Sequence, residues 1–165
     1  MIVRPLRRAD VERCVGILHA NFHRFKESQG GYIPDEIVQN RLVGKYTAEE
    51  LFRRSQNGAY FVAEHDGIPV GLVGLNRPVD GKAEIVNFYL DPAHSRRGIG
   101  RKLFEHVLRH ASEKGITRLF AYSVLNAHDA YEALGFRHLP EKDKYLRHEA
   151  PPGFNARFAC SHASA

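Results

Sequence analysis

The feature that most constrains the fold is a strand, a loop and a helix followed by another strand in the middle of the chain. Residues 83–90 (AEIVNFYL) are rich in β-branched and aromatic side chains, and residues 99–114 carry apolar side chains at helical spacing. Gly115 ends that helix, and residues 119–122 (LFAY) predict the next strand. Strands joined by a helical crossover run parallel, so the sequence predicts a sheet that contains a parallel pair.

The flanking segments predict antiparallel strands around this unit. Asp66-Gly67 and Asp80-Gly81 are typical of tight turns between neighbouring strands. The strands are expected at 2–5, 59–64, 70–75, 83–90, 119–122 and 145–148, with one more short strand where the chain leaves the last helix at Gly135-Phe136. The helices are expected at 11–22, at 47–54 behind a capping-box sequence, at 99–114 and at 127–134. The predicted order is β-α-α-β-β-β-α-β-α-β-β, an α/β fold.

The loop before residue 99 has the composition of an anion site. Gly98 and Gly100 let backbone N–H groups approach a ligand, and the first turn of a helix carries unpaired N–H groups and a partial positive charge. No Walker loop fits, because Gly100 is followed by Arg101, and no dinucleotide fingerprint fits, because Leu103 stands where a third glycine is needed. A turn that merely starts a helix is the alternative. Four cations crowd these residues: Arg96, Arg97, Arg101 and Lys102.

The composition indicates one globular domain with a basic surface. The chain has 165 residues, of which 43% are hydrophobic, and a formal net charge of +5. That charge permits a nucleic-acid partner, but without an aromatic platform or a DNA-binding motif a small polyanionic cofactor is favoured. No apolar run of about 18 residues predicts a membrane span, and the N-terminus lacks a signal-peptide pattern. Cys14 and Cys160 have no metal or redox spacing, so we expect free thiols and a cytoplasmic protein.

Two histidine pairs raise the question of a metal site. His19 and His23, and likewise His106 and His110, have the i, i+4 spacing that places two imidazoles on one helix face. Neither pair has an obvious third ligand, and the chain lacks an HExxH sequence. We therefore expect solvated histidines and no metal.

Taken together, these motifs make the chain similar to the GNAT N-acetyltransferase superfamily, whose members move an acetyl group from acetyl-CoA to an amine. Residues 2–10 resemble the family's first strand and helix start, Arg97-Gly98-Ile99-Gly100 its pyrophosphate loop (Q/R-x-x-G-x-G/A), and residues 127–136 its C-terminal motif. Ser95 stands at the Q/R position, with two arginines beside it. The resemblance covers about residues 1–148 and leaves a tail at 149–165. It implies the acyl-CoA N-acyltransferase fold, a mixed, mostly antiparallel sheet of six to seven strands with about four helices.

The resemblance also implies the contacts that bind acetyl-CoA. The loop N–H groups would hold the pyrophosphate, and backbone groups near Leu90, where the family's fourth and fifth strands splay apart, would stabilise the oxyanion. The asparagine of many relatives has only an approximate counterpart, because Asn126 directly precedes Ala127. The implied contacts are Tyr89, Leu90, Arg96, Arg97, Gly98, Ile99, Gly100, Arg101, Lys102 and Asn126.

Two further residues are implied to be catalytic. An amine with a pKa near 10.4 is neutral in only about one molecule per thousand near pH 7.4, so a base is needed. Glu84, which lies 14 residues before Gly98, resembles the general base of the histone acetyltransferase branch and would act through a water. A solvent-facing strand glutamate is the alternative. Tyr131 resembles the tyrosine that faces the CoA sulfur in relatives, with core packing as its other interpretation.

Two other functions remain open, as does the acceptor. A non-catalytic acyl-CoA-binding module would use the same loop and tolerate loss of Glu84 and Tyr131, and a basic nucleic-acid-binding protein would show steep salt dependence without affinity for CoA. In relatives the region between the first helix and the second strand, here about 22–57, chooses the amine; its mixed charges favour no one amine. We expect a small-molecule amine before a protein, no membrane partner, and a homodimer as one possible assembly.

Overall fold

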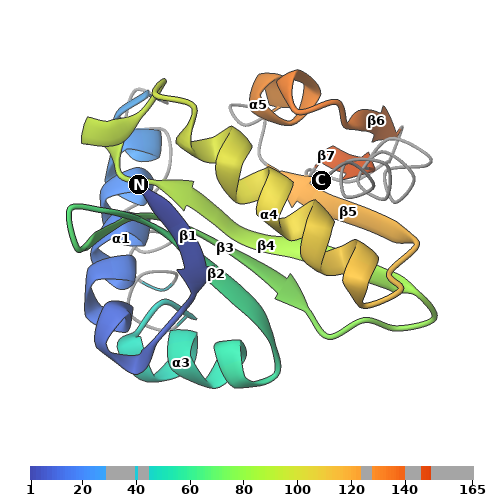
Figure 1. Cartoon of the computed structure of the whole chain (residues 1–165). Coiled ribbons are helices and arrows are strands. Elements are labelled where there is room, and N and C mark those ends of the chain that lie inside the picture. Colours follow the sequence, from blue (N-terminus) through green and yellow to red (C-terminus); the bar gives the residue numbers. More distant parts are fainter. Residues whose placement is uncertain (29–39, 41–44, 124–127, 140–145, 150–165) are drawn as a thin grey trace.

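Figure 1 shows the computed structural model of the chain, which describes residues 1–28, 40, 45–123, 128–139 and 146–149. Seven described strands form one sheet in the order β1-β2-β3-β4-β5-β7-β6. The strands are β1 (Ile2–Pro5), β2 (Gly58–His65), β3 (Ile68–Asn76), β4 (Lys82–Leu90), β5 (Arg118–Ser123), β6 (Arg137–Leu139) and β7 (Leu146–Glu149). The helices are α1 (Val11–Ser28), α3 (Ala48–Gln56), α4 (Ile99–Glu113) and α5 (His128–Ala133), with short 3-10 turns η1 (Arg8–Asp10) and η2 (Pro92–His94).

The predicted order of elements is confirmed. β4 and β5 pair in parallel across the α4 crossover, and the other neighbouring strands pair antiparallel. At the β2–β3 turn, Asp66 and Gly67 adopt φ angles of 50° and 79°, and at the β3–β4 turn Asp80 and Gly81 adopt 48° and 71°. Consecutive left-handed residues match the twist of an antiparallel hairpin, which explains why Asp-Gly marks both turns.

Helices on the two faces of the sheet give the protein two cores. On one face, α4 buries Leu103 and Val107 against β2, β3, β4 and β5. On the other face, α1 and α3 bury Leu18 and Leu51 against Val62 and Leu72. The α3 helix begins where predicted, because the Thr47 hydroxyl accepts a hydrogen bond of 3.2 Å from the Glu50 N–H. The cofactor loop and the predicted base therefore sit on a sheet that is covered on both sides.

Strand β4 carries a bulge that changes which side chains face which core. The register to β3 shifts between the pairs Leu72↔Tyr89 and Gly74↔Val86, so β4 has one residue more than its partner there. Asn87 lies in this bulge with a φ angle of 51°. Beyond it Phe88 packs on the α4 side and Tyr89 on the α1 side.

The parallel pairing of β4 and β5 ends before either strand does. The last paired residues are Ile85 and Ala121, although β4 continues to Leu90 and β5 to Ser123. The C-terminal half of β4 therefore has backbone groups on its β5 side without a ladder partner in β5. This is the opening that the resemblance implied, and α5 lies at the same end of the sheet as the first turn of α4 (Figure 1).

Among the described helices, none is both long and apolar enough to cross a membrane.

Candidate active site

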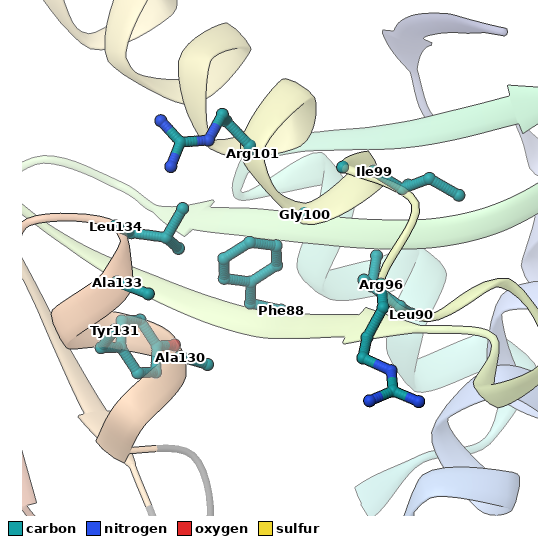
Figure 2. A pocket seen from close by; sticks show the side chains of 11 residues that line it. Phe88, Leu90, Arg96, Ile99, Gly100, Arg101, Ala130, Tyr131, Ala133 and Leu134 are labelled. Carbon is teal, nitrogen blue, oxygen red and sulfur yellow. The ribbon is translucent and has the colours of Figure 1, made fainter.

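A cleft of about 400 Å³ opens between the end of β4, the first turn of α4 and helix α5. Figure 2 shows Phe88 at its centre, with Tyr131 of α5 and Leu134, just after that helix, on one side and Leu90 and Arg96 on the other. Seven residues predicted from the sequence line this cleft: Leu90, Arg96, Gly98, Ile99, Gly100, Arg101 and Tyr131.

The first turn of α4 is built so that its backbone faces the cleft. Gly98 is the N-cap residue with a φ angle of 74°, and a Cβ at this position would meet nothing within 4 Å. Ile99 is buried and anchors the turn to the core. A Cβ on Gly100 would make ordinary contacts with the apolar wall, 3.5 Å from Leu90 Cδ1 and 3.8 Å from Phe88 Cζ. The backbone at Gly100 therefore lies close to that wall. Since N–H groups of a first helical turn have no intrahelical partner, they are available to a ligand here.

The four predicted cations divide into two pairs. Arg96, in a left-handed conformation with φ of 59°, and Arg101 line the cleft on opposite sides of Phe88 (Figure 2). Arg97 and Lys102 are exposed and are not part of the cleft wall. The positive charge is thus concentrated at the mouth, while the floor is apolar. Arg97 and Lys102 as cofactor contacts stay predictions.

An ion pair fixes the loop that leads into α4. The Asp91 carboxylate caps η2 by accepting 2.9 Å from Ala93 N–H, and it also pairs with the Arg13 guanidinium of α1. His94 Nδ1 lies 3.6 Å from the same carboxylate. Burial would raise the pKa of Asp91, but the hydrogen bond from Ala93 N–H and the charge and hydrogen bond of Arg13 outweigh it and lower that pKa. The loop is therefore anchored to α1 by a charged group that stays ionised near neutral pH.

Tyr131 lies in the wall of the cleft with only 8% of its surface exposed. Its ring packs edge-on against Phe88 and Phe136, with centroids 6.2 Å and 5.2 Å apart. Burial raises the pKa of Tyr131, and the charges of Tyr89 and Glu84 raise it further. The phenol is protonated at neutral pH and can donate a hydrogen bond. The ring packs in the core as one interpretation expected, and its role as the acid stays a prediction.

Glu84 lies on the opposite side of the sheet from the cleft. Its neighbours Ala83 and Ile85 are buried on the α4 side, so the period of two directs the glutamate to the α1 side. Oε2 accepts a hydrogen bond of 3.0 Å from Asn76 Nδ2. Burial raises the pKa of Glu84, and the Asn76 hydrogen bond opposes that rise. A general base needs a shift in this direction.

Glu84 and Tyr89 both contribute to the rise in the pKa of Tyr131, after burial. The ring of Tyr89 packs at a tilt against Phe22 of α1, with centroids 6.0 Å apart. The predicted base lies on the α1 side of β4, where β4 is still paired with β5, and the predicted acid lies in the wall of the cleft. Asn126 lies outside the described residues.

Sequence reasoning missed several residues of this site. Phe88 forms the centre of the cleft, yet in an unbulged strand it would face the same side as Glu84, so alternation alone misplaces it. Leu134 and Ala130 have i, i+4 spacing, a signal that could have found their shared face. Asn76 could not have been found, because its partnership with Glu84 depends on the β3–β4 register.

The histidine prediction needs a correction. His106 and His110 are half-buried and pack edge-on against Phe61, with ring centroids 4.6 Å and 5.0 Å away, so each imidazole is only partly solvated. Burial is the main reason that the pKa of each is lowered. In the described part of the chain, no cluster of three or more His, Cys, Asp or Glu side chains is placed to hold a metal ion.

Comparison with known proteins agrees with this geometry. The family description "Acetyltransferase (GNAT) family" matches residues 18–136, most of the chain, and the protein belongs to that family. The fold matches the PaiA N-acetyltransferase of Thermoplasma acidophilum in complex with coenzyme A, with a TM-score of 0.79 and 22% identity over 90% of this chain and 97% of that one.

Two curated relatives carry the names of different acceptors. Human N-acetylaspartate synthetase is 30% identical over 103 residues, which are 59% of this chain and 34% of that protein. Spermidine N(1)-acetyltransferase of Thermoplasma acidophilum is 24% identical over 71% of this chain and 76% of its own length. The chain spans about a third of the length of the synthetase that it matches.

Proposed function

We propose that this protein is an N-acetyltransferase that moves the acetyl group of acetyl-CoA to the primary amine of a small molecule. The observation that carries the proposal is the cleft in which the first turn of α4, the end of β4 and Tyr131 of α5 meet. Membership of the acetyltransferase family and the coenzyme A bound to the PaiA neighbour support it.

The residues of the cleft fit acetyl-CoA. A pyrophosphate needs N–H donors and positive charge, which the turn at Gly98–Gly100 with Arg96 and Arg101 supplies. The apolar wall of Phe88, Leu90 and Leu134 suits an uncharged pantetheine arm. When bound, acetyl-CoA supplies a thioester whose carbonyl carbon is the acetyl donor.

Glu84 is proposed to take the proton of the acceptor amine through a water. Its carboxylate lies on the α1 side of the sheet, so the acceptor would approach from that side and reach the reacting carbon through the gap between β4 and β5. The raised pKa makes Glu84 a stronger base than an exposed glutamate. The hydrogen bond from Asn76 would orient its carboxylate.

Tyr131 and the end of β4 are proposed to act on the developing charges. The Leu90 N–H points away from β3 and would donate to the thioester oxygen as it becomes negative; preorganised donors of this kind contribute a few kcal/mol. The Tyr131 phenol would donate to the leaving thiolate. Because its pKa is raised well above that of a thiol, hydrogen bonding describes this role better than complete proton transfer.

The acceptor is proposed to be a small amine before a protein. N-acetylaspartate synthetase and spermidine N(1)-acetyltransferase name an amino acid and a polyamine as acceptors, so these two classes are the first to screen. The predicted specificity region, 22–57, lies partly outside the described residues.

Calorimetric titration with acetyl-CoA tests the cofactor. We expect micromolar or tighter binding to the wild type and its loss in Gly98→Asp, which places a carboxylate beside the pyrophosphate. Gly98→Asn is the matched control, because Asn has the same shape and tolerates the left-handed conformation without the charge. Loss of acetyl-CoA binding in Gly98→Asp but not in Gly98→Asn would assign the effect to the negative charge.

Thiol release in the presence of candidate amines then tests catalysis. Acetyl-CoA binding without turnover of any amine would favour the non-catalytic module. No acetyl-CoA binding at all, with salt-dependent binding to generic DNA, would favour a nucleic-acid-binding protein and refute the proposal.

A further inference from the structure

A side chain of α1 holds the backbone at the end of β4. Asn21 Nδ2 donates a hydrogen bond of 2.7 Å to the carbonyl oxygen of Leu90, and a second of 2.9 Å to the carbonyl oxygen of Ile17 in its own helix. An amide NH2 group has two hydrogens, so both are used. One bond fixes the side chain to its helix, and the other ties that helix to the strand.

The carbonyl that Asn21 holds faces the gap between β4 and β5. Asp91 N–H donates 2.9 Å to Val70 O in β3, and the C=O of the preceding residue, Leu90, points the opposite way in the same peptide plane. In an extended strand the N–H and C=O of one residue point to the same side. Both polar groups of Leu90 therefore face away from β3, on the side where pairing with β5 has ended.

α1 contacts this strand end at two further points. Arg13, two helical turns before Asn21, donates 3.2 Å to Pro69 O and pairs with the Asp91 carboxylate. The ring of Phe22 packs on Tyr89. Residues four apart lie on one face of a helix, so Arg13 and Asn21 act from the same face. The end of β4 and the loop after it are thus held by α1, and the bond from Asn21 lies on the side where a sheet interior would supply another strand.

We propose that Asn21 is a positioning residue for acetyl transfer: it replaces the missing strand partner of the Leu90 carbonyl and so fixes the orientation of Leu90, whose own N–H, on the adjoining peptide, would polarise the thioester. This inference rests on the proposed function and names a residue that acts through Leu90, with no direct contact to the reacting atoms. Because a donor that is displaced by about 1 Å can cost ~10²-fold in rate, a single lost hydrogen bond here has a large expected effect.

The kinetic test uses an isosteric variant that cannot donate. We expect Asn21→Leu to lower kcat by about 10²-fold while KM for acetyl-CoA changes by less than about threefold, because loss of an interaction made only in the transition state lowers kcat. Thr117→Val is the matched control: the Thr117 hydroxyl also donates to a distant backbone carbonyl, that of Gly81, at 3.1 Å. That bond lies beside the starts of β4 and β5, away from Leu90, so the kcat of this variant should stay at the wild-type value.

A second variant gives a pH signature that a structural role would not produce. The carboxyl introduced by Asn21→Asp cannot donate when ionised but can when protonated. The ratio of its kcat to that of the wild type should therefore rise as the pH falls. An equal kcat for Asn21→Leu and the wild type, or a flat ratio for Asn21→Asp, would overturn the proposal. If Asn21→Leu fails to fold, Asn21→Asp decides alone.

The carbonyl stretch of bound, ¹³C-labelled acetyl-CoA reports the polarisation directly. We expect infrared difference spectra to show a lower frequency on the wild type than in solution, and a return toward the solution value on Asn21→Leu. An unchanged frequency on the variant would contradict a role through the Leu90 N–H.

Amide exchange separates this inference from the proposed function, because it needs no cofactor. In the ligand-free protein, Asn21→Leu should speed exchange of the Asp91 N–H, which belongs to the peptide that Asn21 holds and is bonded to Val70 O, and leave that of buried β3 amides unchanged. If the wild type binds no acetyl-CoA, the proposed function and the catalytic role of Asn21 both fail, and the exchange data still decide whether Asn21 holds the strand. Unchanged exchange at Asp91 would overturn the positioning role even in an active enzyme.

Discussion

Two alanine substitutions two residues apart in the cofactor loop should change stability in opposite directions. Gly98 has a φ angle of 74°, where a Cβ costs roughly 1–2 kcal/mol, while no left-handed φ is found at Gly100 in the first turn of α4. Neither methyl group meets a steric obstacle: there is nothing within 4 Å at position 98, and the nearest atoms at position 100 lie 3.5 Å and 3.8 Å away. The backbone conformation is therefore the main difference between the two sites.

The magnitude follows from a cancellation. Replacing glycine by alanine reduces the entropy of the unfolded chain equally at both positions, a stabilisation of about 0.4–1 kcal/mol. This gain is realised in Gly100→Ala, which should be more stable than the wild type. In Gly98→Ala the left-handed strain exceeds it. The two variants should differ by roughly 1–2 kcal/mol, or about 4 °C in Tm for a domain of this size.

Thermal and urea unfolding of the ligand-free wild type and both variants would measure this difference. Gly98→Asn should lie between the wild type and Gly98→Ala, because Asn adopts the left-handed conformation more readily than other side chains. Equal Tm values for the two alanine variants, or a more stable Gly98→Ala, would refute the backbone geometry on which the cradle depends.

Three further outcomes concern the proposed chemistry and the fold. Glu84→Gln should lower kcat by about 10²-fold or more with little change in acetyl-CoA affinity, and should remove the acidic limb of the pH–rate profile; in the wild type that limb lies above the ordinary glutamate range, because burial raises the pKa of Glu84. Tyr131→Phe should keep its packing, and so its Tm within a few degrees, yet lower kcat by about tenfold in the thiol-release assay. Arg4 lowers the pKa of Asp10 below 3.8, so this ion pair stabilises the protein above that pH and the stability is lost as the pH falls through the folded-state pKa. Asp10→Asn should lower the free energy of unfolding by about 2 kcal/mol at pH 7, measured with urea, and should flatten the pH dependence of that free energy near pH 3–4. The same pH dependence in the variant and the wild type would contradict this.

The order of elements could be predicted because its signals are local. Asp-Gly at both hairpins, the Thr47 cap of α3 and the glycine at the N-terminus of α4 each determine the conformation of their own few residues. The parallel β4–β5 pair followed from chain connectivity alone. None of these inferences required knowledge of which distant residues meet.

The residues of the site could be predicted only where a sequence motif marks them. The spacing of the motifs identified the glycine turn and Tyr131, and both line the cleft. Phe88 was missed because a bulge depends on strand pairing, and no pattern in the sequence around Asn87 predicts it. Asn21 was missed because its partner is a backbone carbonyl 69 residues away, which no side-chain pattern can reveal.

The bulge explains how one strand can serve both partners of the proposed reaction. Before it, the alternation of β4 directs Glu84 to the α1 side; after it, Phe88 and Leu90 lie on the α4 side, where a regular strand would have placed them with the glutamate. The same half of the strand has no ladder pairing with β5, so the gap there is the proposed route between the two faces. A strand that loses a neighbour at this point would fray unless other groups held it. The ties from α1 to β4 and the loop after it are therefore the structural counterpart of the opening that the reaction requires.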